Sequence, residues 1–221
     1  MNANVDAETY LCEKCDPREC DREIKLAKAP VEGVENWTYY FTFTIGENVI
    51  KIGDTVYLER DRPKNENADQ AAKRNSVTFV DFDGKAMSKA DVDIFRIEHL
   101  YKTPDGKKHV YGHHCLRPSE TFHEPTRKFF SNEVLSSPLA GNAPLEAVKG
   151  KCYVLDLATF CKGRPIDARE NDVYVCEFKV DKKARSFSKI AKGYYAINTR
   201  PYCFNTFEER LHPKRTFSVG V

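Results

Sequence analysis

The chain has 221 residues, and 41% of them are hydrophobic, enough to bury the core of one large domain or two small ones. The 35 Lys and Arg residues nearly balance the 33 Asp and Glu residues, so the whole molecule is not a polycation of the histone-tail kind. No apolar run reaches the roughly 18–20 residues of a membrane span, no secretory signal begins the chain, and the eight cysteines lack disulfide-framework spacing, so we expect a soluble intracellular protein with reduced thiols.

The first half of the chain alternates between polar segments and short strand-forming runs. Residues 16–35 carry many charges without periodicity and are typical of a linker. Aromatic and β-branched residues crowd into Trp37–Ile45, which predicts a strand, and Asn48–Glu59 predicts two strands around the turn Gly53-Asp54. Residues 61–75 contain almost no large apolar side chain and are predicted to be an exposed loop.

The second half contains a predicted hairpin and isolated strands. Asp93–Tyr101 and His109–Leu116 flank the turn sequence Thr103-Pro-Asp-Gly106, which predicts an antiparallel hairpin. Cys152–Leu155 and Val173–Val180 are predicted strands. The spacing of apolar residues in Phe204–Leu211 predicts a helix. The sequence thus predicts a mainly β fold, a closed or partly closed barrel-like antiparallel sheet with a few short helices.

Three segments together carry a family resemblance. Residues Gly112–Phe130 join an Arg-Pro-x-Glu-Thr turn to a Thr-Arg-Lys-Phe strand start. With Gly53-Asp54-x-Val56-Tyr57 upstream and Asp172–Glu177 downstream, this arrangement resembles the bromo-adjacent homology (BAH) domain. The resemblance implies a barrel-like β fold and a chromatin-associated role.

Two further runs narrow the resemblance. Tyr10–Arg18 and Leu155–Pro165 resemble the Trithorax-group histone methyltransferases named for absent, small or homeotic discs. In that family a PHD finger ends in a Cys-x-x-Cys-Asp-Pro-Arg run and leads into the BAH domain. The implied organisation is a PHD-finger remnant (1–20), a linker with a flanking strand (21–46), the BAH domain (47–190) and a C-terminal extension (191–221). Polybromo, a remodeller subunit that shares the Glu-Thr-Phe-His and Thr-Arg-Lys-Phe runs, is the alternative.

Two groups of residues are candidate metal sites. Cys12 and Cys15 have the spacing of a zinc-ligand pair, but a closed site needs four ligands and only Cys20 lies nearby. The resemblance implies that they are the last pair of a PHD finger, so that zinc binds only in the intact finger. His113, His114 and Cys115 are the second group, a candidate either for a metal site or for a Cys/His catalytic dyad. Because strand side chains alternate, we expect them to be ordinary sheet residues, and His123 to bond turn backbone.

An aromatic cage for methyl-lysine is a further candidate, since some BAH domains bind methylated histone tails this way. In those readers aromatic residues precede the Arg-Pro-x-Glu-Thr turn, whereas here His114, Cys115 and Leu116 stand before Arg117. Other aromatics that are candidates for a cage or for the core are Phe95, Trp37, Tyr101 and Tyr111.

The C-terminal quarter is the candidate DNA-binding surface. The segment from Lys179 to Arg215 contains ten basic residues and only three acidic ones, whereas the rest of the chain is net acidic. Such a patch can neutralise phosphates without reading bases; a solvated turn is the alternative. The predicted DNA-binding residues are Lys179, Lys182, Lys183, Arg185, Lys189, Lys192, Lys214 and Arg215.

No catalytic motif is recognisable in the sequence, so we expect a non-catalytic module without a cofactor of its own. The resemblance implies a parent enzyme that uses S-adenosylmethionine to methylate histone H3 in the nucleus and opposes Polycomb silencing. The expected partners are nucleosomes, DNA, a histone tail or a chromatin-complex subunit. A protein-interaction or methyl-lysine reader surface, on the Ile94–Leu116 hairpin or in an aromatic pocket, is the alternative, and salt dependence separates the two.

Overall fold

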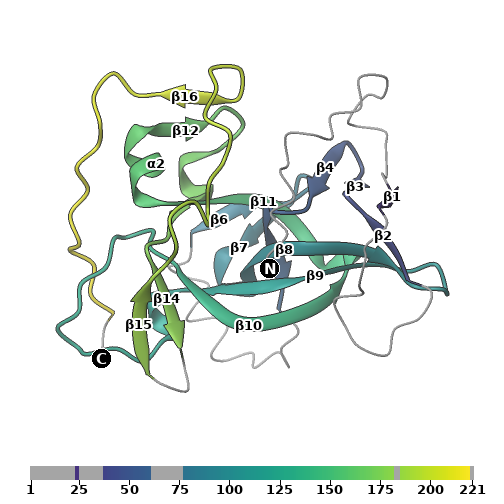
Figure 1. The fold of residues 1–221 in the computed structure, drawn as a ribbon, viewed down its shortest axis with the longest axis horizontal. Helices are drawn as coiled ribbons and strands as arrows, with labels where there is room; N and C mark the ends of the chain where they lie inside the picture. The colour runs from purple at the N-terminus through teal and green to yellow at the C-terminus, as the bar shows by residue number, and fades with distance from the viewer. Residues whose placement is uncertain (1–22, 25–36, 61–76, 182–184, 220–221) are drawn as a thin grey trace.

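The structure is a computed structural model that describes residues 23–24, 37–60, 77–181 and 185–219 (Figure 1). Its strands are β1 (Glu23–Ile24), β2 (Thr38–Tyr40), β3 (Thr42–Ile45), β4 (Asn48–Lys51), β5 (Thr55–Glu59), β6 (Thr78–Val80), β7 (Ala86–Ser88), β8 (Val92–Lys102), β9 (Lys108–Leu116), β10 (Leu135–Pro144), β11 (Val148–Leu155), β12 (Gly163–Pro165), β13 (Val173–Val175), β14 (Phe178–Asp181), β15 (Ser186–Lys189) and β16 (Phe204–Thr206). The described helices are α2 (Leu157–Lys162) and four 3₁₀ turns (Lys89–Asp91, Pro118–Glu120, Leu145–Ala147, Glu170–Asp172). The predicted 61–75 loop and most of the predicted linker lie outside the described residues.

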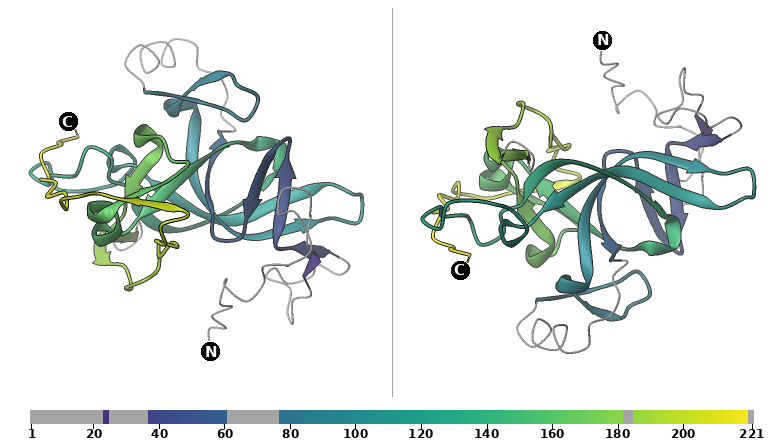
Figure 2. Two further views of the ribbon diagram at one scale, coloured as in Figure 1. Left: turned by 90° about the horizontal axis from the view of Figure 1, so that it is seen from above. Right: turned by 90° about the horizontal axis from the view of Figure 1, so that it is seen from below.

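Ten of the described strands form one sheet. Eight follow the order β13-β11-β5-β8-β9-β10-β14-β15, while β2 joins the far end of β8 and carries β1 on its other side. Figure 2 shows β8, β9 and β10 crossing the molecule, with the C-terminal segments at one end and the β8–β9 turn at the other. The end strands β13 and β15 do not pair with each other, so the sheet is open. The mainly β prediction is confirmed, but the sheet is not closed.

The predicted hairpin is present as β8 and β9, which pair from Ile94 with Cys115 to Lys102 with Lys108. The register shifts between Ile97 and His99, opposite Gly112. A Cβ atom at Gly112 would lie 1.9 Å from the carbonyl oxygen of Arg96, so only glycine allows the two backbones to approach this closely.

Both faces of the central strands are covered. Along β5, Tyr57 packs into one buried cluster with Ile94 and Cys152, whereas Val56 packs into a second cluster with Phe95. Strands that are buried on both sides are apolar at successive positions, which is why β5 lacks a simple alternation.

Two strand pairs differ from the antiparallel prediction. Strands β10 and β14 pair in parallel through Ser136 and Lys179, and β11 and β13 pair in parallel from Tyr153 to Leu155. A parallel pair requires a long crossover, and helix α2 with β12 supplies it between β11 and β13. The single strand predicted over Val173–Val180 is therefore two strands, β13 and β14, that join different neighbours.

The prediction of a helix over Phe204–Leu211 is wrong. Phe204–Thr206 forms strand β16 against β12, and the following residues have no regular structure. The N–H groups of Phe207 and Leu211 instead donate to the carbonyls of Lys162 and Cys161 at 2.9 and 3.0 Å. The segment thereby satisfies carbonyls that the end of α2 leaves open.

Within the ranges that the structure describes, no helix is long and apolar enough to span a membrane.

Candidate functional site

The upstream and downstream family motifs meet inside the core. The Tyr57 hydroxyl donates to Oδ1 of Asp172 at 2.8 Å and lies 3.0 Å from the Tyr174 hydroxyl. Lys89 Nζ is 3.0 Å from the same Asp172 oxygen, so the buried carboxylate has a cationic partner. Burial is the main reason why the pKa values of Tyr57 and Tyr174 are raised. This network joins β5, β13 and the turn before β8, and its role is structural.

The Arg-Pro-x-Glu-Thr turn is also a structural joint. The Arg117 guanidinium donates to the carbonyls of Lys89 and Val92 at 2.8 and 3.0 Å. The backbone N–H of Arg117 donates to the Glu120 carboxylate at 2.7 Å, and Glu120 also pairs with Arg60. The turn therefore fixes the start of β8.

The Thr-Arg-Lys-Phe run packs against β14 and β15. The Arg127 guanidinium lies 4.1 Å from the ring centroid of Phe187 and 5.0 Å from that of Phe178. Phe129 is fully buried and pairs through its backbone with Phe217. As predicted, His123 contacts turn backbone, with Nδ1 3.2 Å from the carbonyl of Thr121.

The side chains of His113, His114 and Cys115 have separate surroundings. His113 Nδ1 lies 2.9 Å from Glu98, while His114 packs edge-on against Phe95 on the other face. Burial raises the pKa of the Cys115 thiol to about 11, which disfavours the thiolate that nucleophilic attack needs. In the part of the chain that the structure describes, no group of three His, Cys, Asp or Glu side chains could hold a metal ion. Cys12, Cys15 and Cys20 lie outside it.

The four aromatic cage candidates pack against neighbouring side chains. Trp37 stacks flat on Tyr101, with ring centroids 4.2 Å apart and an interplanar angle of 2°, which leaves no space for an ammonium group between them. Phe95 is fully buried in the core, and Tyr111 contacts His99 and His113. Their roles in this structure are packing ones.

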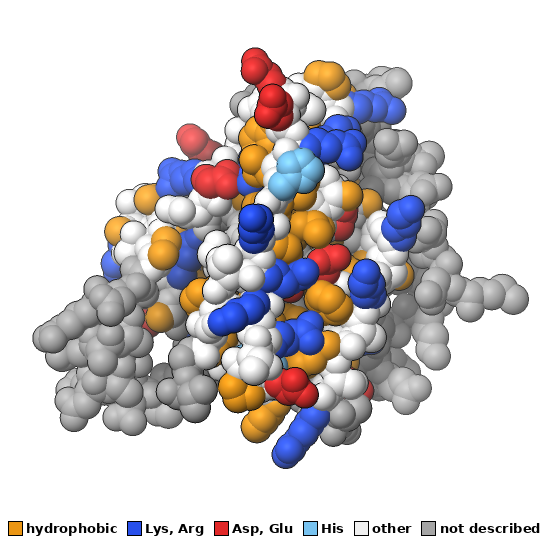
Figure 3. Space-filling model, turned by 90° about the vertical axis from the view of Figure 1, so that its left-hand side faces the viewer, with side chains coloured by type: hydrophobic (Ala, Val, Ile, Leu, Met, Phe, Trp, Pro, Cys, Tyr) orange, Lys and Arg blue, Asp and Glu red, His pale blue; other side chains and the backbone are white. Residues whose placement is uncertain are grey.

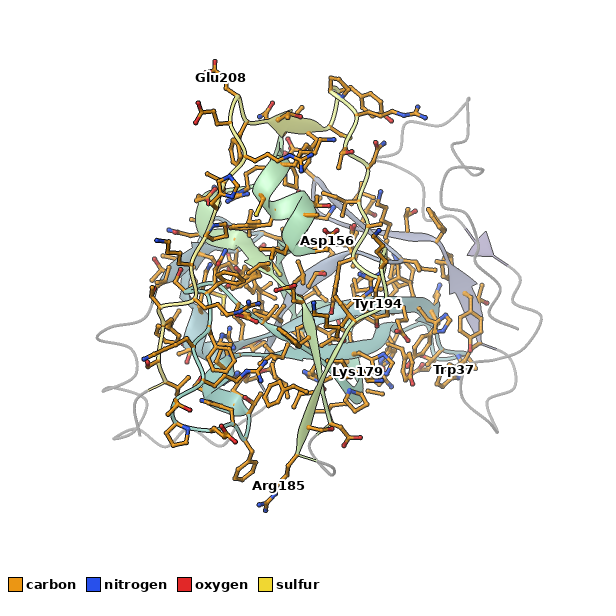
Figure 4. All side chains as sticks on the ribbon, turned by 60° about the vertical axis from the view of Figure 1, so that its left-hand side comes forward. Trp37, Asp156, Lys179, Arg185, Tyr194 and Glu208 are labelled. Atoms are coloured by element: carbon orange, nitrogen blue, oxygen red, sulfur yellow. The ribbon has the colours of Figure 1, made fainter. Side chains whose placement is uncertain are left out.

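Two of the predicted DNA-binding lysines share a pocket. Lys179 of β14 and Lys189 of β15 line a pocket of about 350 Å³ with His113 of β9, Ser136 of β10 and Tyr194, together with Ser137, Pro138, Ile190 and Ala191. Figure 4 shows Lys179 and Tyr194 close to the middle of the molecule and Arg185 at the tip of the β14–β15 hairpin, where its guanidinium lies 5.0 Å from the ring centroid of the exposed Phe122. We call β14, β15 and the exposed side chains of Lys179, Arg185 and Lys189 the basic hairpin.

Charge extends beyond this hairpin. Figure 3 shows Lys and Arg side chains gathered over the middle of one face, interspersed with apolar and a few acidic side chains. Lys192 and Lys214 are exposed. Arg215 differs from them, because its guanidinium pairs with Glu133 at 3.2 Å and also with Glu177. It therefore ties the C-terminal segment to the domain, while Lys182 and Lys183 lie outside the described residues.

Tyr194 is one of the pocket residues that sequence reasoning missed. Its ring is 38% exposed, and the Arg96 guanidinium lies 5.0 Å from its centroid. Arg96, in turn, lies 4.9 Å from the ring of the buried Tyr195. The sequence held one signal, a Tyr-Tyr pair directly after the basic run, but nothing local indicates that β9 and β10 lie beside it.

The open sheet of long strands, with its motif residues meeting in the core, defines a member of a known chromatin-domain family. The family model described as "BAH domain" matches residues 48–191, so the chain belongs to the BAH domain family.

Relatives extend the match to nearly the whole chain. It is 42% identical over 217 residues to "Histone-lysine N-methyltransferase ash1" of Drosophila melanogaster, and 31% identical over 238 residues to "Probable histone-lysine N-methyltransferase lin-59" of Caenorhabditis elegans. These alignments cover 98% and 97% of this chain but 10% and 18% of the relatives, so the chain spans a small part of their length. The crystal structure of the yeast Rsc2 BAH domain has the same fold, with a TM-score of 0.53, 22% identity, and coverage of 71% of this chain and 56% of that one.

Proposed function

We propose that this BAH domain is a non-catalytic module that holds its parent protein on chromatin by contacting phosphates of nucleosomal DNA with the basic hairpin. The observation that carries the proposal is that Lys179 and Lys189, from two paired strands, both line one open pocket, while Arg185 adds positive charge at the tip. Lysine ammonium groups neutralise backbone phosphates and release counterions, which gives affinity without sequence preference. Two lysines at one pocket also disfavour a methylated lysine, because like charges repel.

The relatives support a chromatin setting. Two carry names of histone-lysine N-methyltransferases, and the structural neighbour is a domain of yeast Rsc2. We infer a nuclear parent enzyme that takes its methyl group from S-adenosylmethionine in another domain. Cys12 and Cys15 complete a zinc-binding PHD finger that precedes the BAH domain in that parent.

The test is a double charge reversal, Lys179→Glu with Lys189→Glu, assayed by gel shift on nucleosomes and on free duplex DNA. At about 50 mM salt we expect DNA affinity to fall at least about tenfold, since each lost phosphate contact removes one released counterion. The dependence of the logarithm of affinity on the logarithm of salt should weaken by about two.

The matched control is Lys85→Glu with Lys107→Glu, which changes the net charge equally at two exposed lysines outside the hairpin. If the control and hairpin variants lose the same amount of DNA affinity, the overall charge of the protein accounts for the binding. If the hairpin variant binds nucleosomes like the unmodified protein, DNA contact through this surface is wrong.

A further inference from the structure

Ser188 lies beside Lys179, one of the two lysines that carry the proposed DNA contact. It is exposed in β15, the last strand of the main sheet, and its Cα partner across the hairpin is Lys179 of β14. Residues that pair directly in an antiparallel ladder point to the same face, with Cβ atoms about 4.5–5.5 Å apart. The next pair along, Val180 with Phe187, faces the core instead, where Val180 is 1% exposed. The hydroxyl of Ser188 therefore shares the solvent face with the ammonium group of Lys179.

The sequence before Ser188 has the pattern of a substrate for a basophilic protein kinase. Arg185 stands three residues before the serine, at the hairpin tip, where it is exposed and lies over the exposed ring of Phe122 at 5.0 Å from the centroid (Figure 4). Kinases that select charged substrates discriminate by such charge patterns. The strand is extended and its outer edge has no neighbouring strand among the described residues, so a kinase can reach it.

Ser186 is the competing acceptor, and its position is less suitable. It is also exposed, but its Cα partner across the hairpin is Asp181. A phosphate opposite a carboxylate is disfavoured, because like charges on directly paired residues destabilise the strand pair. A phosphate on Ser188 faces a lysine instead.

We propose that Ser188 is a phosphorylation site and that its phosphate switches off the DNA contact made by Lys179. The Ser188 oxygen attacks the γ-phosphorus of ATP in a basophilic serine kinase, so that an O–P bond forms. The bond between the γ-phosphorus and the β,γ-bridging oxygen breaks, ADP leaves, and the hydroxyl proton passes to the base of the kinase. The product carries about −1.5 to −2 charge at neutral pH, which pairs with Lys179 and repels DNA phosphates.

The first experiment tests the site. The full chain is incubated with ATP and a purified kinase that requires arginine three residues before the acceptor, and the modified residue is located by mass spectrometry. We expect one phosphate on Ser188, retained in Ser186→Ala and lost in Ser188→Ala and in Arg185→Ala. Phosphate on Ser186, on another residue or on none overturns the site.

The second experiment tests the switch, which rests on the proposed DNA contact. Protein carrying genetically encoded phosphoserine at position 188 is compared with unmodified protein for binding to duplex DNA. We expect at least about tenfold weaker binding at about 50 mM salt, because one counterion-releasing contact is lost and a repulsive charge is added. In a Lys179→Ala background the same phosphoserine should cost less, since its partner is absent.

The outcomes separate the two proposals. If unmodified protein binds no DNA, the proposed function fails together with the switch, while the kinase experiment still decides the site. If unmodified protein binds DNA and phosphoserine changes nothing, the function stands and the switch is overturned. An equal loss in the presence and absence of Lys179 overturns the pairing with that lysine.

Discussion

Tyr57 has partners from segments 115 and 117 residues away, Asp172 and Tyr174, at the point where β5, β13 and the Lys89 turn meet. At the scale of single residues, the upstream and downstream family motifs therefore form hydrogen bonds with each other inside the core. The sequence predicted these residues as family markers. It could not predict that they bond one another, because their contact depends on a sheet order that no local pattern encodes.

Tyr57→Phe removes one hydroxyl from this network and leaves the ring in place. We expect a loss of about 1–3 kcal/mol in the free energy of unfolding, because Tyr174 and Asp172 each lose a buried partner. Urea denaturation measures it. Tyr202→Phe is the matched control, since Tyr202 is 68% exposed. Equal effects of the two changes would show that the network contributes nothing.

His114 predicts a pH effect on stability. Burial lowers its pKa below the ordinary 6.5, although Asp93 and Glu120 oppose that shift. The unfolded chain therefore binds a proton more readily than the folded protein does, so stability is full above pH 6.5 and declines as the pH falls from there towards the lower folded pKa. The lowered pKa of His99, also caused by burial, acts in the same direction.

We expect the melting temperature to fall between about pH 7 and pH 5.5, with a shallower fall in His114→Gln. His212→Gln, at an exposed histidine, should leave the slope unchanged. A slope that is identical in the His114 variant and the unmodified protein would contradict this assignment.

At the scale of elements, the sequence predicted correctly those elements that depend on neighbouring residues in the chain. The β8–β9 hairpin follows from strand-forming runs on both sides of a Pro-Asp-Gly turn. The helix prediction at Phe204–Leu211 failed because helical spacing of three apolar residues was outweighed by pairing with β12 and by the open carbonyls of α2. In the candidate site, charge alone indicated Lys179 and Lys189, whereas Tyr194 and His113 join them only through tertiary packing.

Gly163 tests the docking of β16. A Cβ atom there would lie 2.1 Å from the carbonyl oxygen of Asn205, and backbone cannot yield cheaply at such a distance. We expect Gly163→Ala to destabilise the domain by about 1–3 kcal/mol through overpacking, as measured by thermal unfolding. Asn205→Ala, which trims an exposed side chain and keeps that carbonyl, should stay within about 0.5 kcal/mol of the unmodified protein.

At the scale of the whole molecule, a formal net charge of +2 conceals a basic C-terminal quarter on a body that is net acidic. The structure places part of this charge on one hairpin and uses Arg215 internally, as a partner of Glu133 and Glu177. A count of charges in the sequence could not separate an exposed basic residue of the hairpin from Arg215, because the difference depends on which acidic side chains lie nearby in the fold.

The 221-residue chain should not methylate nucleosomes supplied with S-adenosylmethionine. The reason is that the sequence contains no recognisable motif for cofactor binding or methyl transfer. Transfer of a radiolabelled methyl group measures this, with an active histone methyltransferase assayed in parallel as the positive control. Turnover above a blank without protein would refute it.

The register of β5 has a consequence for how the chain folds. One side of β5 pairs with β8, but the other pairs with β11, where Thr55 meets Cys152. During synthesis, β5 thus leaves the ribosome about a hundred residues before its second neighbour, and loop closure over such a span is slow. A nascent chain that ends before Val148 exposes an apolar strand edge, which invites aggregation. The domain should therefore acquire its stability late and all at once, after most of its length has emerged.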